Sequence, residues 1–318
     1  MTSFVIRRLF LGIIVLLIAS VLVFVMMHVL PGDPLLLFLG EQYLSYEPEQ
    51  LDKIRHEMGL DKPVILQYFD WVGGVIRGDL GSSLTYQTPV TTMIKDRLPV
   101  TLILSFLALL VSTMLGPTFG VIAAIRRGKW QDTTLSVLAN LGITLPVFWV
   151  GIVLLYVFSL KLHWFETLFT PASEDFGKFV MSLIMPVFCL SLFGTAAQTR
   201  QARSAMLEVA HQDYVRTAWS KGLRERVVVF RHMLKNGLIP VVTTMGMQVS
   251  FLFGGAVMVE KVFNIPGIGR MLVEGVNAKD FQVVQGGVLL MAVIIVITNL
   301  LVDMAYAWLD PRIRQSYR

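Results

Sequence analysis

The sequence predicts an all-α integral membrane protein with six transmembrane helices. Its 318 residues are 55% hydrophobic and only 15% charged, and the mean hydropathy of +0.67 lies outside the range of ordinary soluble proteins. The apolar residues collect in runs of about 20, the length that crosses a bilayer as a helix. Buried helices of soluble proteins rarely stay uncharged over such a length, so the runs indicate membrane spans.

The first run is expected to be a retained span, although Arg7 and Arg8 before it resemble the start of a signal peptide. It is longer than the roughly 7–15 apolar residues of such a peptide, and no small-x-small cleavage site followed by a soluble domain is evident. The six predicted spans are residues 9–30, 100–125, 135–160, 179–197, 238–258 and 286–306.

The basic residues predict the orientation, because cytoplasmic loops carry an excess of Lys and Arg. With both termini in the cytoplasm, the inner segments hold 16 Lys/Arg against 6 Asp/Glu, and the outer segments hold 11 against 16. The short loop with Arg126, Arg127 and Lys129 gives the clearest evidence. The isoelectric point near 9.3 therefore reflects membrane topology and lipid contact, and we expect no nucleic-acid partner.

Residues 31–99 form an extracytoplasmic segment that is too large for a simple connector and opens with the turn signal of residues 31–34. The pattern predicts two amphipathic helices, one from Pro48 to a stop at Gly59 and one after Pro63. Such helices lie on the membrane surface or cover the span bundle, and a structural lid without ligand contacts is an equal alternative. Their apolar faces consist of Leu51, Ile54 and Met58 in the first helix and Ile65, Phe69, Val72 and Ile76 in the second.

Special backbone residues interrupt several spans. Pro117, Pro146 and Pro186 lie inside the second, third and fourth runs, and each removes a backbone hydrogen bond, so kinks are expected. Gly254 and Gly255 in the fifth run permit a neighbouring helix to approach closely.

The chain lacks the residues that several other functions need. Glu260 and Asp303 lie toward span ends, whereas ion-coupled carriers keep acids at depth. No zinc-protease His pair, nucleophile elbow or phosphate-binding loop occurs. The single Cys189 excludes an intrachain disulfide. We therefore expect no enzyme and no metal site, and any active transport must draw its energy from another subunit.

The stretch from residue 214 to residue 240 is polar and basic, with six Lys or Arg and one acid. Its pattern predicts two short helices hinged at Gly222, with Asp213 capping the first and Lys221 in its last turn. The second helix is expected to begin near Leu223. Its apolar stripe would be Leu223, Val227, Phe230 and Leu234, with Arg224, Arg231 and Lys235 on another side.

Two explanations for this basic stretch remain open. The cations satisfy the positive-inside rule and bind lipid headgroups, at roughly 1 kcal/mol each. Alternatively, the stretch docks in a groove of a cytoplasmic partner, which also explains the helix–glycine–helix pattern and the apolar stripe.

The chain contains a series of different short motifs, one after another. They are Gly32-Asp33-Pro34, Met58-Gly59-Leu60-Asp61-Lys62-Pro63 with Gln67-Tyr68, Gly78-Asp79-Leu80-Gly81-Ser82-Ser83, Arg231-His232, Asn236 before Ile239-Pro240, Glu260-Lys261-Val262-Phe263 with Pro266-Gly267-Ile268-Gly269, and Leu309-Asp310-Pro311-Arg312. The basic stretch resembles the cytoplasmic EAA loop of binding-protein-dependent ABC importer permeases. With these motifs, nearly the whole chain resembles the peptide/nickel (dipeptide, oligopeptide and glutathione) permease family.

The basic stretch departs from the general motif of that superfamily. Arg216, Thr217 and Ala218 stand where the motif has Glu-Ala-Ala, so only the last alanine and Gly222 match. Pro240 also follows Gly222 at a longer distance than in the general pattern. Both departures are usual for the peptide/nickel subgroup, and they put in doubt any contact inferred from the missing glutamate.

The resemblance implies a type I ABC importer permease fold, in the cytoplasmic (inner) membrane of a prokaryote. It divides the chain into an N-terminal segment with the first span (1–30), an extracytoplasmic helical segment (31–99) and a core permease domain (100–318). The coupling loop, residues 200–237, would insert into an ATP-binding subunit. The site positions implied for this loop are Tyr214, Arg216, Ala218 for close approach, Lys221 and Arg226 at a polar rim, Gly222 for the bend, Leu223 and Val227 for apolar docking, His232 and Pro240.

Further motif positions are implied outside that loop, and no substrate-binding residue is identified. They are Gly32, Asp33, Pro34, Gly78, Asp79, Gly81, Glu260, Phe263, Pro266, Gly267 and Gly269. The implied partners are a second homologous permease, two ATP-binding subunits that hold ATP and Mg²⁺, and an extracytoplasmic substrate-binding protein. This chain itself would hold no cofactor.

The resemblance implies short peptides as the cargo, with nickel or glutathione as alternatives within the family. The histidines are scattered and no pair shows ligand spacing, which weakens the nickel alternative. They are His28, His56, His163, His211 and His232. Alternatives of another class are an autonomous carrier or channel, which would transport without ATPase partners, and a membrane enzyme such as an intramembrane protease, for which no buried nucleophile and base are visible.

Overall fold

The computed structural model describes residues 2–29, 35, 39–57 and 59–309, and every regular element in this part of the chain is helical. Strand-like pairing there is limited to one isolated bridge between Ser82 and Pro89. In chain order the elements are α1 (Thr2–Val29), η1 (Gly40–Ser45), α3 (Pro48–Glu57), α4 (Val64–Ile76), α5 (Val90–Ile125), α6 (Trp130–Thr144), α7 (Val147–Leu154), η2 (Leu155–Lys161), α8 (Phe176–Ala210), α9 (Asp213–Ser220), α10 (Glu225–Val227), η3 (Val228–Met233), α11 (Leu234–Gly237), α12 (Ile239–Val262), α13 (Ile268–Asn277) and α14 (Phe281–Leu309).

The elements form two compact units. Unit 1 consists mainly of Met1–Val100 and Pro266–Leu300, and unit 2 of Thr101–Ile265 and Leu301–Gln315. Within the described residues, four helices, α1, α5, α8 and α14, are long and apolar enough to cross a membrane. The number rises to six when each of two bent helix pairs is taken as one span. The structure therefore confirms the predicted class, an all-helical membrane protein, with four to six spans.

The third apolar run forms two helices separated by a sharp bend, where the sequence predicted one kinked helix over residues 135–160. The break at Leu145 and Pro146 turns the axis by 106° between α6 and the following helix. Pro146 lacks a backbone N–H, and it forces Leu145 into an extended conformation (φ −72°, ψ 131°). In contrast, α5 and α8 continue past Pro117 and Pro186.

The fifth apolar run is also bent, by 57° between Ile239–Gly246 and Phe251–Val262 of α12. A Cβ added at Gly255 would lie 3.0 Å from Leu190 Cδ1 on α8, so this glycine permits the close approach that the sequence predicts. Gly254 has open space beside it instead.

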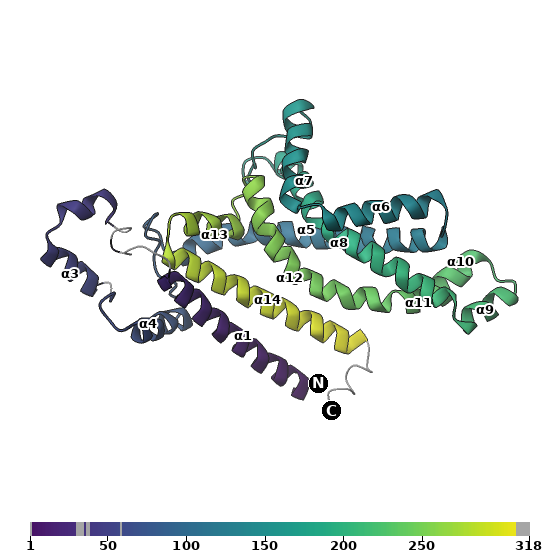
Figure 1. Ribbon diagram of the computed structural model, residues 1–318, viewed down its shortest axis with the longest axis horizontal. Coiled ribbons are helices and arrows are strands. Elements are labelled where there is room, and N and C mark those ends of the chain that lie inside the picture. Colours follow the sequence, from purple (N-terminus) through teal and green to yellow (C-terminus); the bar gives the residue numbers. More distant parts are fainter. Residues whose placement is uncertain (1, 30–34, 36–38, 58, 310–318) are drawn as a thin grey trace. The chain divides into compact units, whose positions relative to one another are not determined.

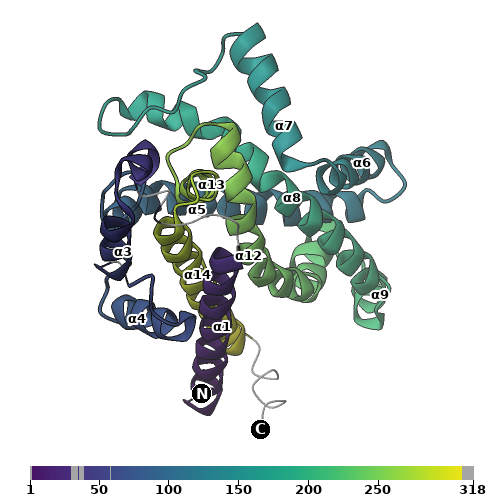
Figure 2. The same cartoon turned by 60° about the vertical axis from the view of Figure 1, so that its left-hand side comes forward.

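Unit 1 is organised around α1 and α14, which lie side by side (Figures 1 and 2). A Cβ on Gly12 would lie only 2.7 Å from Val296 Cγ1, which shows how closely the two helices approach. Further along, Val23 and Met27 of α1 pack against Val284 of α14. These contacts bury apolar side chains that would otherwise face outward.

The two amphipathic helices predicted in the extracytoplasmic segment are present as α3 and α4. Gly59 has φ +67°, the left-handed conformation expected of a stop signal. Beyond it, His56 Nδ1 lies 2.6 Å from Asp61 Oδ2, and this hydrogen bond holds the pKa of Asp61 below its usual range. The turn at residues 31–34 and Met58 lie outside the described residues.

Helix α4 packs on α1 through a different face from the predicted stripe. Tyr68 OH lies 2.9 Å from Ser20 Oγ, and the rings of Tyr68 and Trp71 lie 5.3 and 5.9 Å from that of Phe24. The predicted apolar face is turned outward, with Ile76 81% exposed. Aromatic and polar side chains hold the helix in place, which leaves the aliphatic stripe for lipid or another surface.

Unit 2 is built on α8, against which α6, α7 and α12 pack. Small residues permit this packing. A Cβ at Gly120 of α5 would lie 2.5 Å from the Thr199 carbonyl oxygen, and one at Gly142 of α6 would lie 2.9 Å from Ala196 Cβ. Such close approach between helix backbones is typical of membrane bundles, where small residues line helix interfaces.

Candidate functional site

The candidate site is the basic segment, defined here as residues 211–240. Helix α8 continues to Ala210, so the first part of the predicted loop 200–237 is an extension of this helix. The short elements α9, α10, η3 and α11 then gather near its C-terminal end (Figure 1). The segment leads directly into α12, which begins at Ile239.

The hinge of the segment lies where the sequence predicts it. Gly222 has φ +71°, and its N–H donates to the Trp219 carbonyl at 2.9 Å, which closes the end of α9. The predicted cap is wrong, because Gln212 occupies the N-cap position and Asp213 is the first residue of the helix. The negative charge of Asp213 still suits the positive end of the helix dipole without a capping hydrogen bond.

The inner face of the segment forms an apolar cluster with the ends of α5 and α8. Val215 of α9 and Met233 of η3 are buried there with Ala124 of α5 and Met206 of α8. Ala218 belongs to the same cluster and is only 4% exposed. The methyl group of Ala218 therefore makes its close contacts inside the segment, and a role of Ala218 toward an ATP-binding subunit stays a prediction.

The second helix of the segment begins at Glu225, close to the predicted start near Leu223. Val227 and Phe230 of the predicted apolar stripe are exposed, Phe230 to 70%, so they lie on the surface where the resemblance implies apolar docking by Val227. Val228, Val229 and Met233 point inward. Residues 228–233 form a π-helix, in which hydrogen bonds run from i to i+5, so the α-helical spacing of four and three does not describe the buried face.

Two further contacts fasten the segment. The Asn236 side-chain amide donates to the Tyr214 hydroxyl at 2.9 Å, which joins α9 to α11. A Cβ at Gly237 would lie 2.5 Å from Met206 Sδ, so the backbone of α11 touches α8. Pro240 sits at the start of α12, where a missing N–H costs nothing. His232 is half-buried.

The outer face of the segment combines cations with exposed apolar side chains. On this face, within the described residues, Arg216 Nη1 lies 4.0 Å from Asp213 Oδ1, which makes a long ion pair. Trp219 and Phe230 are exposed beside the predicted contact residues. Phe230 belongs to the predicted apolar stripe, whereas Trp219 was not among the predicted contact residues. The exposed side chains of this face are Tyr214, Arg216, Trp219, Lys221, Arg224, Arg226, Val227, Phe230, Arg231 and Lys235.

A buried ion pair that the sequence did not reveal supports the same end of unit 2. The Arg203 guanidinium on α8 donates to both carboxylate oxygens of Asp132, at 2.6 and 2.9 Å. Asp132 is almost fully buried, and it also accepts a hydrogen bond from the Gly128 N–H at 3.0 Å. This bidentate pair fixes the turn between α5 and α6 onto α8.

The motif positions of unit 1 act as turn and capping residues. Gly78 and Gly81 have φ +84° and +78°, which favours glycine. Asp79 accepts a hydrogen bond from the Gly81 N–H at 2.9 Å, and Ser83 donates to the buried Asp280 at 2.6 Å. Pro266 precedes α13, Gly267 is its N-cap residue, and Gly269 is buried in its first turn. Gly32, Asp33 and Pro34 lie outside the described residues.

Motif positions in unit 2 are buried. Glu260 is fully buried, and it accepts a hydrogen bond from Thr101 Oγ1 at 2.6 Å. Phe263 is buried beside Gly151 of α7, where an added Cβ would meet its ring at 3.1 Å. These positions hold helices together rather than present a surface to a ligand. Within the described residues, no group of three or more His, Cys, Asp or Glu side chains could hold a metal ion.

Comparison with known proteins identifies the family. The family described as binding-protein-dependent transport system inner membrane component matches residues 116–315, and the N-terminal domain of such components matches residues 1–105. The chain is 40% identical over 315 residues to a putative peptide transport system permease protein of Brucella abortus (strain 2308), with 99% of each chain covered. It is 39% identical to the di/tripeptide transport system permease protein DppB of Pseudomonas aeruginosa (strain UCBPP-PA14), covering 99% of this chain and 100% of the relative.

Two more similarities agree with these. The glutathione transport system permease protein GsiC of Escherichia coli O6:H1 (strain CFT073) is 38% identical, with 99% of each chain covered. The fold is similar to that of a chain in the inward-facing MetNI methionine ABC transporter, with a TM-score of 0.56 at 14% identity, covering 69% of this chain and 96% of the other. Both family matches together span nearly the whole sequence. The protein therefore belongs to the family of binding-protein-dependent transport system inner membrane components.

Proposed function

We propose that this chain is the permease subunit of an ATP-driven importer that moves short peptides across the inner membrane of a prokaryote by alternating access. The observation that carries the proposal is the end-to-end similarity to relatives named as peptide permeases, at 38–40% identity. Glutathione transport is the second candidate, because GsiC matches at 38%. Nickel as cargo has no comparable support among these relatives.

The importer would contain a second homologous permease, two ATP-binding subunits and an extracytoplasmic substrate-binding protein. ATP and Mg²⁺ would bind to the ATP-binding subunits, and this chain would hold no cofactor and catalyse no reaction. Both termini and the basic segment would face the cytoplasm, as the distribution of Lys and Arg predicts.

The basic segment would couple ATP hydrolysis to transport by docking in a cleft of an ATP-binding subunit. Its exposed cations and aromatic side chains supply a surface for such a partner. Its inner face is packed against α5 and α8 and its end continues into α12. A segment held in this way moves as one body with these helices, so a push on its outer face would reach the membrane spans.

The test of this function uses the complete importer reconstituted in liposomes, with peptide uptake and ATP hydrolysis measured together. Phe230→Asp places a charge on the proposed docking face and should reduce ATP-dependent uptake by at least about tenfold, the loss typical of a strong interface residue. Leu44→Asp changes an exposed apolar side chain of η1, outside the segment, and should leave uptake unchanged.

Three outcomes would contradict the proposal. Full uptake by the Phe230→Asp importer would remove the docking role of the segment. Uptake by this chain without any ATP-binding subunit would indicate an autonomous carrier or channel. Absence of uptake for every short peptide, with uptake of glutathione or nickel, would replace the cargo.

A further inference from the structure

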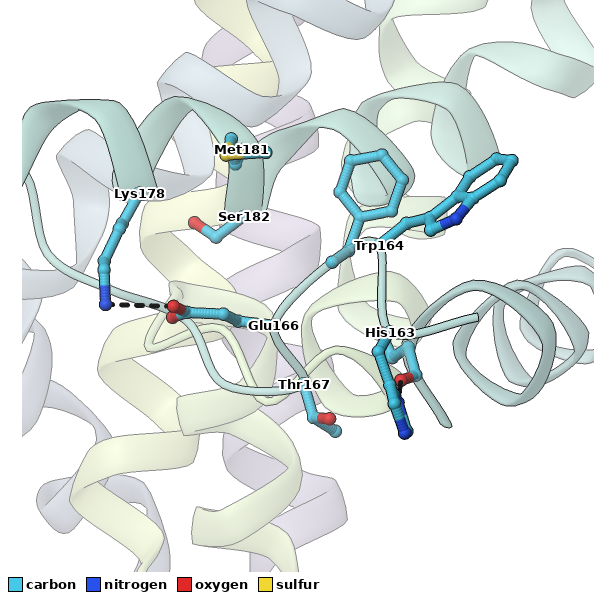
Figure 3. Close-up of a pocket in the computed structure, with 9 residues that line it drawn as sticks. His163, Trp164, Glu166, Thr167, Lys178, Met181 and Ser182 are labelled. Atoms are coloured by element: carbon cyan, nitrogen blue, oxygen red, sulfur yellow. Dashed lines mark hydrogen bonds and ion pairs between the residues drawn. The ribbon is translucent and has the colours of Figure 1, made fainter. Parts of the chain in front are cut away.

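A cavity of about 420 Å³ lies in unit 2, between the turn that follows η2 and the first turns of α8 (Figure 3). At one end, Lys178 Nζ and Glu166 Oε1 form an ion pair at 3.0 Å. Trp164, Phe165 and Met181 line the cavity as well. Its size falls within the range of small-molecule sites, and its lining mixes polar side chains, Ser159 and Ser182 among them, with these apolar ones.

The two charges can exchange partners. The side chains of Lys178 and Glu166 are 53% and 55% exposed, and ion pairs exposed to this degree add little to stability because water solvates both partners. A ligand that carries a carboxylate and an ammonium group could therefore separate them, each charge then pairing with the opposite charge of the ligand. Neither side chain is needed to hold α8, whose start is capped by Asp175 through the Lys178 N–H.

The backbone around the cavity has two unusual features. His163 adopts φ +52°, which is uncommon for a residue with a side chain, and its Nδ1 lies 2.9 Å from the Ser159 carbonyl oxygen. Ser159 belongs to the π-helix η2, and π-helical turns are often found at functional sites. Ser159 is only 5% exposed, and its hydroxyl has no hydrogen-bond partner in the described part of the chain. An unpaired buried hydroxyl in the cavity wall indicates that the site is not complete by itself.

We propose that this cavity binds the charged ends of a short zwitterionic peptide. The peptide ammonium pairs with Glu166, its carboxylate pairs with Lys178, and an apolar side chain lies against Trp164. An extended dipeptide spans at most about 7 Å, so the two flexible side chains need to move apart by a few ångströms around it. This inference rests on the proposed function, because it takes peptides as the cargo, and it adds the place where the permease first contacts that cargo.

The alternative occupant is a side chain of the substrate-binding protein, because the predicted orientation places this turn outside the membrane. The zwitterion is favoured by the lining. Opposite charges lie together at one end of the cavity, and Trp164 and Phe165 line it as well, a combination that matches the charged ends and an apolar side chain of a small molecule. A protein side chain would satisfy one charge and leave the other unpaired.

The experiment uses the permease assembled with its partner subunits in lipid nanodiscs, without the substrate-binding protein. Binding of alanyl-phenylalanine is measured by saturation-transfer NMR, which detects weak ligands. Saturable binding is expected for the natural chain. Lys178→Met and Glu166→Gln should each weaken it by about tenfold, since each removes one charged hydrogen bond.

Chemically blocked probes assign the two ends. The N-acetylated dipeptide should bind weakly and respond no further to Glu166→Gln, and the C-amidated dipeptide should respond no further to Lys178→Met. The matched control is Lys62→Met with Asp70→Asn, which removes an equally exposed ion pair with a 2.6 Å separation in unit 1. This double variant should bind the dipeptide like the natural chain.

Three results would overturn the inference. One is no saturable binding up to about 10 mM dipeptide. Another is equal binding by the natural chain and by the Lys178→Met and Glu166→Gln variants. The third is normal dipeptide binding by the Lys178→Met and Glu166→Gln variants, together with a loss of the stimulation of ATP hydrolysis when the substrate-binding protein is added. That result would assign the cavity to the substrate-binding protein. Peptide uptake by the complete importer, measured in parallel, separates these results from a failure of the proposed function itself.

Discussion

At the scale of single residues, the most informative side chain is Asp132. It is nearly buried, and its carboxylate is satisfied by the Arg203 guanidinium and the Gly128 N–H. A charge in such a position is tolerable only because its partners are in place. The sequence showed Asp132 as one of the few acids on the predicted inner side, with no sign that it is paired to a residue 71 positions away.

This pairing predicts the effect of Asp132→Asn on stability. The amide leaves the half-buried guanidinium without a counter-charge, which should lower the free energy of unfolding by about 2 kcal/mol. Thermal unfolding of the detergent-solubilised chain measures the loss. Asp70→Asn removes the acid of the exposed pair with Lys62 and should leave the midpoint unchanged. Equal shifts of the unfolding midpoint for both variants would contradict a larger contribution of the Asp132–Arg203 pair to stability.

At the scale of elements, the sequence predicts the helices and does not identify which of their side chains are buried. Six apolar runs, the helices after Pro48 and Pro63 and the hinge at Gly222 all correspond to observed elements. The sequence left open which surface each of the two predicted stripes contacts. In the basic segment Val228 and Met233 pack inward, which leaves Val227 and Phe230 of the stripe exposed. In α4 the aromatic side chains contact α1, which leaves most of the aliphatic stripe exposed. Both choices depend on neighbours distant in sequence, which local periodicity does not contain.

The contact between α11 and α8 gives a prediction at this scale. Gly237→Val should crowd Met206 and lower the free energy of unfolding by about 1–3 kcal/mol, the usual cost of overpacking. Gly237→Val combined with Met206→Ala should recover part of the loss, because the smaller side chain vacates the space. Gly254→Val is the matched control, since no atom lies within 4 Å of an added Cβ there. Thermal unfolding of the natural chain and the three variants is the measurement, and no recovery in the double variant would contradict the contact.

At the scale of the whole molecule, composition predicts the fold class, whereas most of the candidate site could not be predicted from the sequence. Hydropathy alone predicts a helical membrane protein, and the observed breaks at Pro146 and within α12 refine the span count. Which side chains of the basic segment remain exposed depends instead on which residues pack into the apolar cluster. Ala218 lies inside the cluster, whereas Val227 and Phe230 of the predicted stripe stay exposed, so packing decides which of the predicted positions a partner can contact.

The placement of the basic segment against a partner, and its side of the membrane, can be tested by cysteine labelling. Cys189 is the single cysteine of the sequence and is buried, so an introduced thiol should react alone. Phe230→Cys should react quickly with a membrane-impermeant maleimide only from the cytoplasmic side. Binding of the ATP-binding subunits should slow this reaction by at least about tenfold, because the core of a protein interface excludes solvent. Leu168→Cys, on a loop of unit 2 outside the basic segment, should react only from the opposite side and should be indifferent to those subunits. Labelling of both cysteines from the same side would contradict the predicted orientation. Unchanged reactivity of Phe230→Cys in the complex would show that the basic segment does not contact the ATP-binding subunits.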